Sequence, residues 1–201
     1  MLESISQFWY LYVVIIALIV AVIICGSKAA KAMSKRNKIV REQEEKLLRM
    51  KELSEKYKDL TPQQAKSADA KELTEGVAMA LERTLEKSDN PDNQFKSVKM
   101  WQKIAFALFF FNEDVGQSLQ FFFKNNAEPL PGVAVKALNE IGYSEISTLA
   151  ARMYAMYDDK NEGVSLDLKL CTELNEKFKA VYDENVLYEK IKEYIVLKIS
   201  E

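Results

Sequence analysis

An uncharged apolar run near the start of the sequence constrains the fold of this chain more than any other feature. Residues 8–25 read FWYLYVVIIALIVAVIIC, and the uncharged stretch extends from Ser4 to Ser27. As a helix the run would be about 27 Å long, close to the roughly 30 Å hydrocarbon core of a bilayer. Aromatic residues cluster at its N-terminal end, as they do at membrane interfaces. We therefore predict a transmembrane anchor in residues 1–27, with its span at about 8–25.

Two cleaved signals are the alternatives to an anchor. A secretory signal peptide begins with basic residues, whereas the only charged residue before the apolar run is Glu3. A lipoprotein signal that ended at Cys25 would need a small residue before the cysteine, and Ile24 stands there. Both alternatives are therefore less favoured than a retained anchor.

A basic flank follows the apolar run and predicts its orientation. Residues 28–60 carry a net charge of +5, and residues 61–201 carry −6. Because a dense basic flank stays in the cytoplasm, we expect the N-terminus outside and the C-terminal part in the cytoplasm. The same flank could also bind anionic lipid headgroups at the membrane surface. This membrane-surface basic cluster consists of Lys28, Lys31, Lys35, Arg36, Lys38 and Arg41.

Residues 34–60 contain neither glycine nor proline and predict an amphipathic stalk helix. Apolar or aromatic residues recur at Val40, Leu47, Met50, Leu53, Tyr57 and Leu60. The last four follow the 3-4 spacing of a coiled-coil seam, but the pattern lasts for fewer than three heptads. The stalk could pack onto its own domain or join two copies as a homo-oligomer, and we favour packing onto its own domain.

The rest of the chain, residues 61–201, predicts one compact all-α domain. Thr61-Pro62 is typical of a helix start, and the scarcity of glycine and proline argues against a sheet. Gly142 is expected to end one helix and Ser144 to cap the next, so that the two form a tight pair. Segments 88–94 and 158–163 are predicted loops. We expect helices near 70–87, 98–111, 114–124, 131–141, 145–157, 165–181 and 185–199.

Seven of the ten phenylalanines fall between residues 106 and 123, including two runs of three. Three consecutive aromatic residues cannot all lie on one face of a helix, because neighbours in a helix are 100° apart. The helices that carry these runs should therefore contact partners on more than one side and form the centre of the core. A ligand groove or a surface that dips into the membrane is the functional alternative.

Residues 112–142 combine a Gly-x-x-x-Gln element, three aromatic residues, a short loop and an Ala/Leu helix that ends in Ile-Gly. The positions are Gly116, Gln120, Phe121, Phe122, Phe123, Ala137, Leu138, Ile141 and Gly142. This pattern resembles a family of small bacterial all-helical domains of unknown function, whose best-known relative is an acidic DNA-mimic protein. Residues 174–195 are similar to the closing element and last helix of that family, so the resemblance spans most of residues 98–199.

The resemblance implies an all-helical fold in which Gly116, Gln120, the three phenylalanines and Gly142 are structural or bind a partner. The chain departs from the family where an Asn-Gly-Gly-aromatic lead becomes 115–118, VGQS, and where Lys124 replaces an asparagine. If those family residues serve binding, this chain has lost that function; if they shape a helix start, the fold survives. DNA mimicry itself needs a strongly negative surface, whereas the acidic residues here are interleaved with lysines.

The inventory of reactive side chains is poor. There is no histidine, and the two cysteines, Cys25 and Cys171, imply no disulfide framework. No glycine precedes a Lys-Ser/Thr pair, and the acidic segment from Asp158 places lysines at two of the positions that a calcium loop needs. Cys171 is expected to be a small core residue. We predict no catalytic residue, no cofactor and no metal, although an enzyme that uses only Asp, Glu, Lys or Tyr remains an alternative.

Together these features predict a single-pass protein of the bacterial inner membrane. Its cytoplasmic helical domain would be a non-enzymatic interaction or adaptor module with a protein partner and no nucleic acid. The alternatives are a self-associating structural or stress-related membrane protein and, less favoured, a DNA-mimic-type regulator of a DNA-binding protein.

Overall fold

The computed structural model describes residues 36–38, 40–41, 43–157 and 166–200. The chain divides into two compact units, Met1–Arg49 and Met50–Glu201. The described residues of the first unit are helical, and their side chains are exposed. No helix within the described ranges is long and apolar enough to cross a bilayer. The predicted span at 8–25, Lys28, Lys31, Lys35 and the predicted loop 158–163 all lie outside the described residues.

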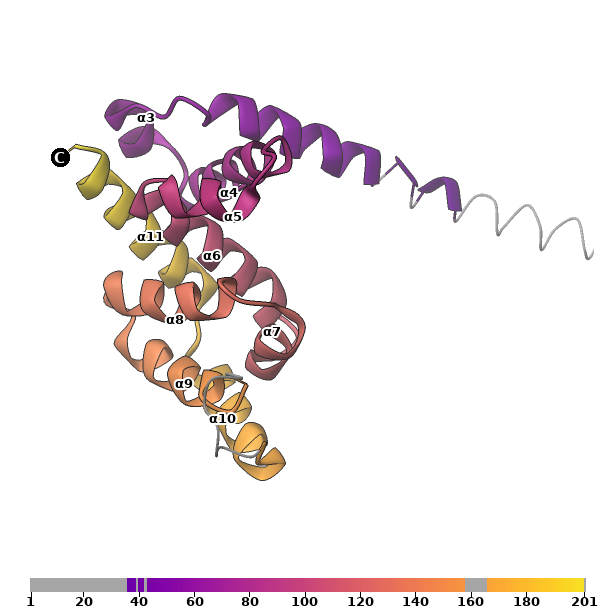
Figure 1. Cartoon of the computed structure of the whole chain (residues 1–201), viewed down its shortest axis with the longest axis vertical. Helices are drawn as coiled ribbons and strands as arrows, with labels where there is room; N and C mark the ends of the chain where they lie inside the picture. The colour runs from indigo at the N-terminus through magenta and orange to yellow at the C-terminus, as the bar shows by residue number, and fades with distance from the viewer. Residues whose placement is uncertain (1–35, 39, 42, 158–165, 201) are drawn as a thin grey trace, which may run out of the picture. The chain divides into compact units, whose positions relative to one another are not determined.

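The described part of the second unit is helical and contains no strand, which confirms the all-α prediction (Figure 1). The stalk is helical over residues 43–56 and precedes the other helices of this unit. The helices after the stalk are α3 (Pro62–Ser67), α4 (Ala70–Glu86), α5 (Pro91–Ser97), α6 (Met100–Val115), α7 (Leu119–Asn125), α8 (Leu130–Glu140), α9 (Ser144–Tyr154), α10 (Leu168–Val181) and α11 (Glu184–Ile199).

Two predicted helix boundaries depend on local backbone chemistry and are confirmed. Thr61 caps α3: its side chain accepts from the Gln64 N–H, and the Gln64 side chain accepts from the Thr61 N–H at 2.9 Å. Gly142 follows α8 with φ +70°, a conformation that glycine adopts without strain. The prediction for Ser144 is wrong by one residue. Tyr143 is the N-cap of α9, because only this residue lies between Gly142 and the first residue of the helix.

The predicted loop at 88–94 is wrong in its second half, because α5 begins at Pro91. The Asn90 side chain accepts from the Asn93 N–H at 3.1 Å and caps this helix. The predicted helix at 114–124 also starts too early. Helix α6 continues to Val115, and α7 begins only after Ser118, whose hydroxyl accepts from the Phe121 N–H at 3.0 Å.

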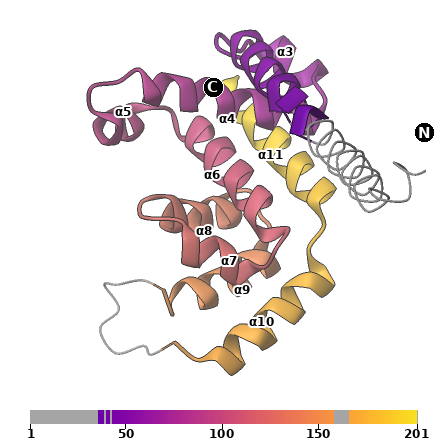
Figure 2. The same cartoon turned by 90° about the vertical axis from the view of Figure 1, so that its right-hand side faces the viewer.

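Helix α6 lies at the centre of the second unit and packs against α4, α7, α8 and α11 (Figure 2). Phe111 and Phe122 are fully buried, with ring centroids 5.1 Å apart in an edge-to-face contact. Phe106 and Phe110 are half-buried and pack with Phe109 in a smaller cluster on another side of α6. The phenylalanine runs therefore contact partners on more than one side, and the core prediction is confirmed.

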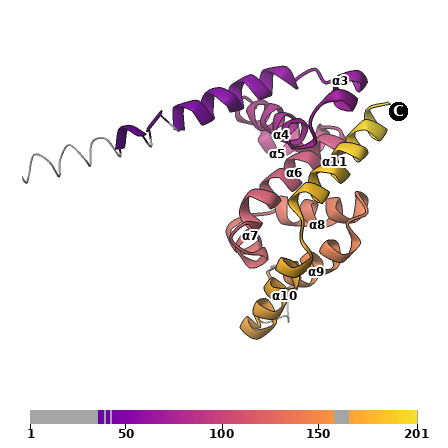
Figure 3. The same cartoon turned by 180° about the vertical axis from the view of Figure 1, so that it is seen from behind.

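The last helix, α11, lies beside the first helix after the stalk. It packs against α3 (Figure 3). The Lys192 ammonium on α11 donates to the carbonyl of Ala68, which caps the C-terminal end of α3, at 2.7 Å. The first and last helices after the stalk are therefore neighbours in space.

A polar network joins α6 to the α10–α11 junction inside the otherwise apolar core. The Asn112 amide donates to the Tyr188 hydroxyl at 2.9 Å, and the Tyr182 hydroxyl donates to the Asn112 carbonyl. Phe178 stacks on Tyr182 with centroids 4.6 Å apart. Because a buried polar group without a partner costs about 1 to 3 kcal/mol, this network favours one packing of α6 against α10 and α11.

The network predicts a loss of stability at high pH. Burial raises the pKa of Tyr182 and of Tyr188 well above the ordinary tyrosine value near 10. The two phenols are neutral in both states below pH 10, whereas above pH 10 only the unfolded chain loses these protons. The free energy of unfolding should therefore fall above pH 10, by up to about 1.4 kcal/mol per pH unit for each tyrosine.

Urea unfolding of the full chain at pH 9 and pH 11 checks this expectation. The Tyr182→Phe variant cannot lose a phenolic proton at that site, so its stability should fall less steeply with pH than that of the parent chain. An equal fall in both proteins would show that Tyr182 does not resist ionisation in the folded state.

The last turns of the stalk dock on α4 within the second unit. Leu53 and Tyr57 are buried, which confirms for these positions that the stalk packs onto its own domain. A methyl group added at Gly76 would lie 2.0 Å from Cδ2 of Tyr57, so the ring needs the absence of a side chain there. Leu60 packs against the same core.

Polar contacts on both sides of Tyr57 complete this docking, which we name the stalk latch (residues 53–57 on α4). The Tyr57 hydroxyl donates to the Glu72 carboxylate at 2.8 Å, and the Lys56 ammonium pairs with the same carboxylate. These partners hold the pKa of Glu72 below its ordinary value, with the hydrogen bond from Lys56 the largest cause. Arg83 pairs with Glu55 and donates to the Ser54 hydroxyl at 3.2 Å.

Candidate binding groove

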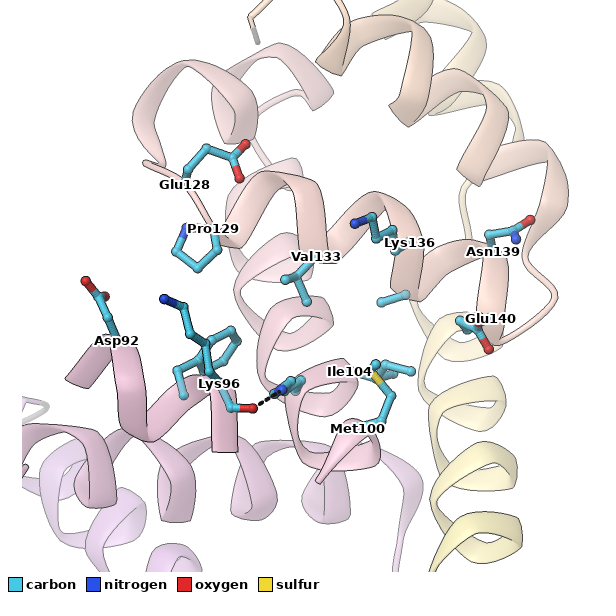
Figure 4. Close-up of a pocket in the computed structure, with 13 residues that line it drawn as sticks. Asp92, Lys96, Met100, Ile104, Glu128, Pro129, Val133, Lys136, Asn139 and Glu140 are labelled. Atoms are coloured by element: carbon cyan, nitrogen blue, oxygen red, sulfur yellow. Dashed lines mark hydrogen bonds between the residues drawn. The ribbon is translucent and has the colours of Figure 1, made fainter. Parts of the chain in front are cut away.

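A groove of about 600 Å³ opens between α5, the first turns of α6 and α8 (Figure 4). Its volume lies within the range of about 300 to 1,000 Å³ that is usual for ligand sites. The walls are α5 and α8, and the start of α6 forms the floor. It is lined by Asp92, Phe95, Lys96, Met100, Lys103, Ile104, Glu128, Pro129, Val133, Lys136, Ala137, Asn139 and Glu140.

The floor and lower walls of the groove are apolar. Phe95 and Ile104 are buried, whereas Met100 at the start of α6 leaves 58% of its surface exposed. Val133 on α8 is half-buried and faces the same space (Figure 4). An exposed methionine beside buried apolar side chains is typical of surfaces that adapt to an apolar partner.

The rim of the groove is charged. Asp92, Lys96 and Glu128 lie toward one end, Lys136 lies farther along α8, and Glu140 lies at the other end (Figure 4). Acidic and basic side chains are therefore mixed along the rim.

Two contacts hold the walls in place. The Lys103 ammonium on α6 donates to the Lys96 carbonyl at 2.7 Å and lies 5.9 Å from the centroid of the Phe95 ring. These contacts fix the end of α5 on α6. On the opposite wall, the Tyr154 hydroxyl donates to the Glu128 carboxylate at 2.7 Å. These contacts join α5 to α6 and the segment before α8 to α9.

None of the lining side chains carries a hydroxyl or a thiol, whereas three carboxylates and three ammonium groups line the same space. What the groove offers is an apolar floor for burial and charged groups at the rim for orientation.

Most of the predicted family-motif residues lie outside the groove, around α7 and at the end of α8. The Gln120 amide donates to the Tyr157 hydroxyl at 2.7 Å, and its backbone N–H donates to the Asn175 side chain at 3.0 Å. Phe122 and Phe123 are buried, and Phe121 is half-buried. Gly116 follows α6 in ordinary helical conformation and Gly142 follows α8. Of the motif residues, Ala137 on α8 lines the groove.

Other residues singled out by sequence have structural surroundings. Cys171 is buried 4.0 Å from the Met156 sulfur, and burial raises its pKa, which confirms it as a core residue. Two acidic residues near the start of α11 also have structural roles: Asp183 caps α11, and Glu184 pairs with Lys71 at 2.7 Å. Within the described ranges, no three Cys, Asp or Glu side chains gather in a way that could hold a metal ion.

In the first unit, Arg36, Lys38 and Arg41 of the basic cluster are exposed. Their accessibility is compatible with both predicted roles, headgroup binding and setting the topology. Neither role is tested by their position, so both stay predictions.

The sequence analysis did not predict the groove. One local pattern, a capping residue followed by proline, could have indicated its α5 wall. Asn90-Pro91 is the same cap-and-proline pattern as Thr61-Pro62, and it marks the start of the α5 wall. A search of this chain against protein-family models, curated proteins and solved structures returned no match, so the family resemblance in residues 98–199 also stays a prediction.

Proposed function

We propose that this chain is a non-enzymatic interaction module, tethered to the cytoplasmic face of a membrane, that binds a protein segment in the groove between α5, α6 and α8. The observation that carries the proposal is the combination of an apolar floor, from which Met100 is exposed, and a charged rim at one place on the surface. An amphipathic helix laid in a groove uses these two elements, its apolar residues for affinity and its charges for register.

The exposure of Met100 at the groove favours a macromolecular segment as the ligand. Met100 projects with 58% of its surface exposed, where a partner could cover it. Long apolar side chains that become fully desolvated at the centre of an interface contribute most of its binding energy. The charged residues around Met100 would then form the water-excluding rim.

The tether in this proposal comes from the sequence. The apolar run at 8–25 and the basic cluster after it predict an anchor with the domain on the cytoplasmic side. Within the second unit, the stalk latch holds residues 53–57 on α4.

A Met100→Asp variant tests the groove. The aspartate places a charge on the apolar floor, so we expect at least a tenfold loss of the protein adducts that the full chain forms on cross-linking in its native membranes. Leu197→Asp is the matched control, since Leu197 lies on α11 with 59% of its surface exposed. Both variants should keep the parent's helical circular dichroism, because both side chains are exposed.

Unchanged adducts in Met100→Asp would contradict the groove as the binding surface. Equal losses in both variants would contradict it as well, because they would show a general effect of a new surface charge. If the chain fractionates away from membranes while Met100→Asp still loses adducts, the tether is wrong and the interaction module stands.

A further inference from the structure

Helix α11 carries apolar residues on a side that the core does not use. The helix packs against α3, α4 and α6 and lies at the outside of the second unit (Figure 2). Val186 and Leu197 nevertheless expose 40% and 59% of their surface. At 100° and 1.5 Å per residue, these two side chains are about 20° apart around the helix axis and about 16.5 Å apart along it. They therefore lie on one exposed line.

Two opposite charges lie between these apolar residues. Lys190 and Glu193 are each within about 40° of Val186 and of Leu197 around the helix. Glu193 is exposed, and the half-buried Lys190 has its ammonium 5.9 Å from the centroid of the Tyr143 ring. Neither charge has an ion-pair partner among the described residues. We name this surface the α11 face; it consists of Val186, Lys190, Glu193 and Leu197.

The α11 face is complementary to itself. The apolar pair and the charged pair have the same midpoint, halfway between positions 191 and 192. A second α11 laid antiparallel about a two-fold axis at that midpoint therefore places Val186 opposite Leu197 and Lys190 opposite Glu193. Each of these contacts then occurs twice, as in any isologous interface. A parallel arrangement would instead place like charges opposite each other, so electrostatic complementarity favours the antiparallel one.

We propose that the α11 face pairs antiparallel with the α11 face of a second copy of this chain. A second copy carries the complementary residues at the matching spacing, because the pattern is symmetric about its midpoint. One face of one helix is smaller than the roughly 1,200 Å² of a standard stable interface, so we expect a weak, transient dimer. This inference goes beyond the proposed function, since no residue of the α11 face lines the groove.

Thiol cross-linking of two differently tagged full-length copies in mild detergent tests the pairing and its direction. Cys25→Ala removes one native thiol, and Cys171 can stay because it is buried. With a short bifunctional thiol reagent, Val186→Cys mixed with Leu197→Cys should cross-link at least tenfold faster than either variant with itself. Unlike positions are adjacent in the antiparallel pair, whereas like positions are about 16.5 Å apart. Leu168→Cys mixed with Leu197→Cys gives the rate of random collision, since Leu168 on α10 is 66% exposed.

Charge reversal tests the two ion pairs in the same cysteine background. Lys190→Glu in both copies places carboxylates opposite each other at both charged contacts, and Glu193→Lys in both copies places ammonium groups there. Either change should slow cross-linking about tenfold. Lys190→Glu in one copy and Glu193→Lys in the other join opposite charges again at both contacts, so the rate should recover. Glu176→Lys, at an exposed position of α10, is the matched control.

Three results would overturn the proposal. Faster cross-linking between like positions would show that the helices pair in parallel. A rate equal to that of the Leu168→Cys mixture would show that no second copy covers the α11 face. A mixture of the two charge-reversed copies that stays slow would show that Lys190 and Glu193 do not face each other.

The groove and the α11 face can be tested apart. Met100→Asp should leave the cross-link between copies unchanged while it removes adducts with other proteins. Leu197→Asp should weaken the cross-link between copies and keep the adducts with other proteins. Failure of either proposal is therefore visible while the other stands.

Discussion

Replacing Phe111 with alanine is expected to cost about 4 kcal/mol of unfolding free energy, the largest loss from any single phenylalanine of the first run. The side chain is fully buried and meets the rings of Phe122, Phe178 and Tyr182 at centroid distances of 5.1, 6.0 and 6.4 Å. Its removal would leave a cavity where α6, α7 and α10 converge. For a chain of this size the loss corresponds to a fall in Tm of roughly 10 °C, measured by circular dichroism on the full chain.

Phe110→Ala is the matched comparison, since it removes the same atoms one residue earlier in the same helix. Phe110 is half-buried and contacts the smaller cluster around Phe106 and Phe109. Its substitution should cost less than half as much as Phe111→Ala, because water can fill the space at the surface. Equal losses at the two positions would contradict the division of the phenylalanine run between a main core and a satellite cluster.

Gly76→Ala should release the stalk latch, although glycine to alanine in a helix interior ordinarily stabilises by about 1 kcal/mol. The new methyl group would lie 2.0 Å from Cδ2 and 2.7 Å from Cγ of Tyr57, so the ring must leave its place. Tyr57 would then lose its burial and its hydrogen bond to Glu72. We expect a net loss of about 2 kcal/mol in unfolding free energy.

Limited trypsin digestion reports the release directly, because Lys51, Lys56 and Lys58 lie in or beside the latch. Cleavage there should accelerate at least tenfold in Gly76→Ala, as expected when local opening becomes easier by about 1.4 kcal/mol. Gly116→Ala is the control. A methyl group at Gly116 would lie 3.6 Å from the nearest carbonyl, an ordinary contact, so stability and cleavage should not change. Unaltered cleavage in Gly76→Ala would show that the stalk end is held by its polar contacts alone.

The features predicted correctly from the sequence are those that depend on a few neighbouring residues. The cap at Thr61, the left-handed turn at Gly142 and the split of the phenylalanine runs all follow from backbone preference or helical period. The start of α5 at Pro91 follows the same rule as Thr61-Pro62. It was missed because the polar stretch around it resembles a loop when the capping pattern is not applied.

The latch and the groove could not be predicted in this way, because both join residues that are distant in the chain. Tyr57 contacts Gly76 only because the end of the stalk packs on α4 in the folded chain. An isolated glycine within a helical pattern does not indicate which residue will pack against it. Asp92 and Glu140 frame one groove only because α5 and α8 both pack beside the start of α6. The predicted anchor and half of the basic cluster lie outside the described residues, so they stay predictions.

The contact between α3 and α11 has a consequence for how this domain could be rearranged. Because Lys192 reaches the carbonyl of Ala68, the entry and exit of the helix series are adjacent, and the chain path is nearly a closed loop. A short peptide could bridge the two ends at little entropic cost, and new ends could then be opened at an exposed turn. Circular permutation would change the order of the helices along the chain. It should nevertheless preserve their packing around α6.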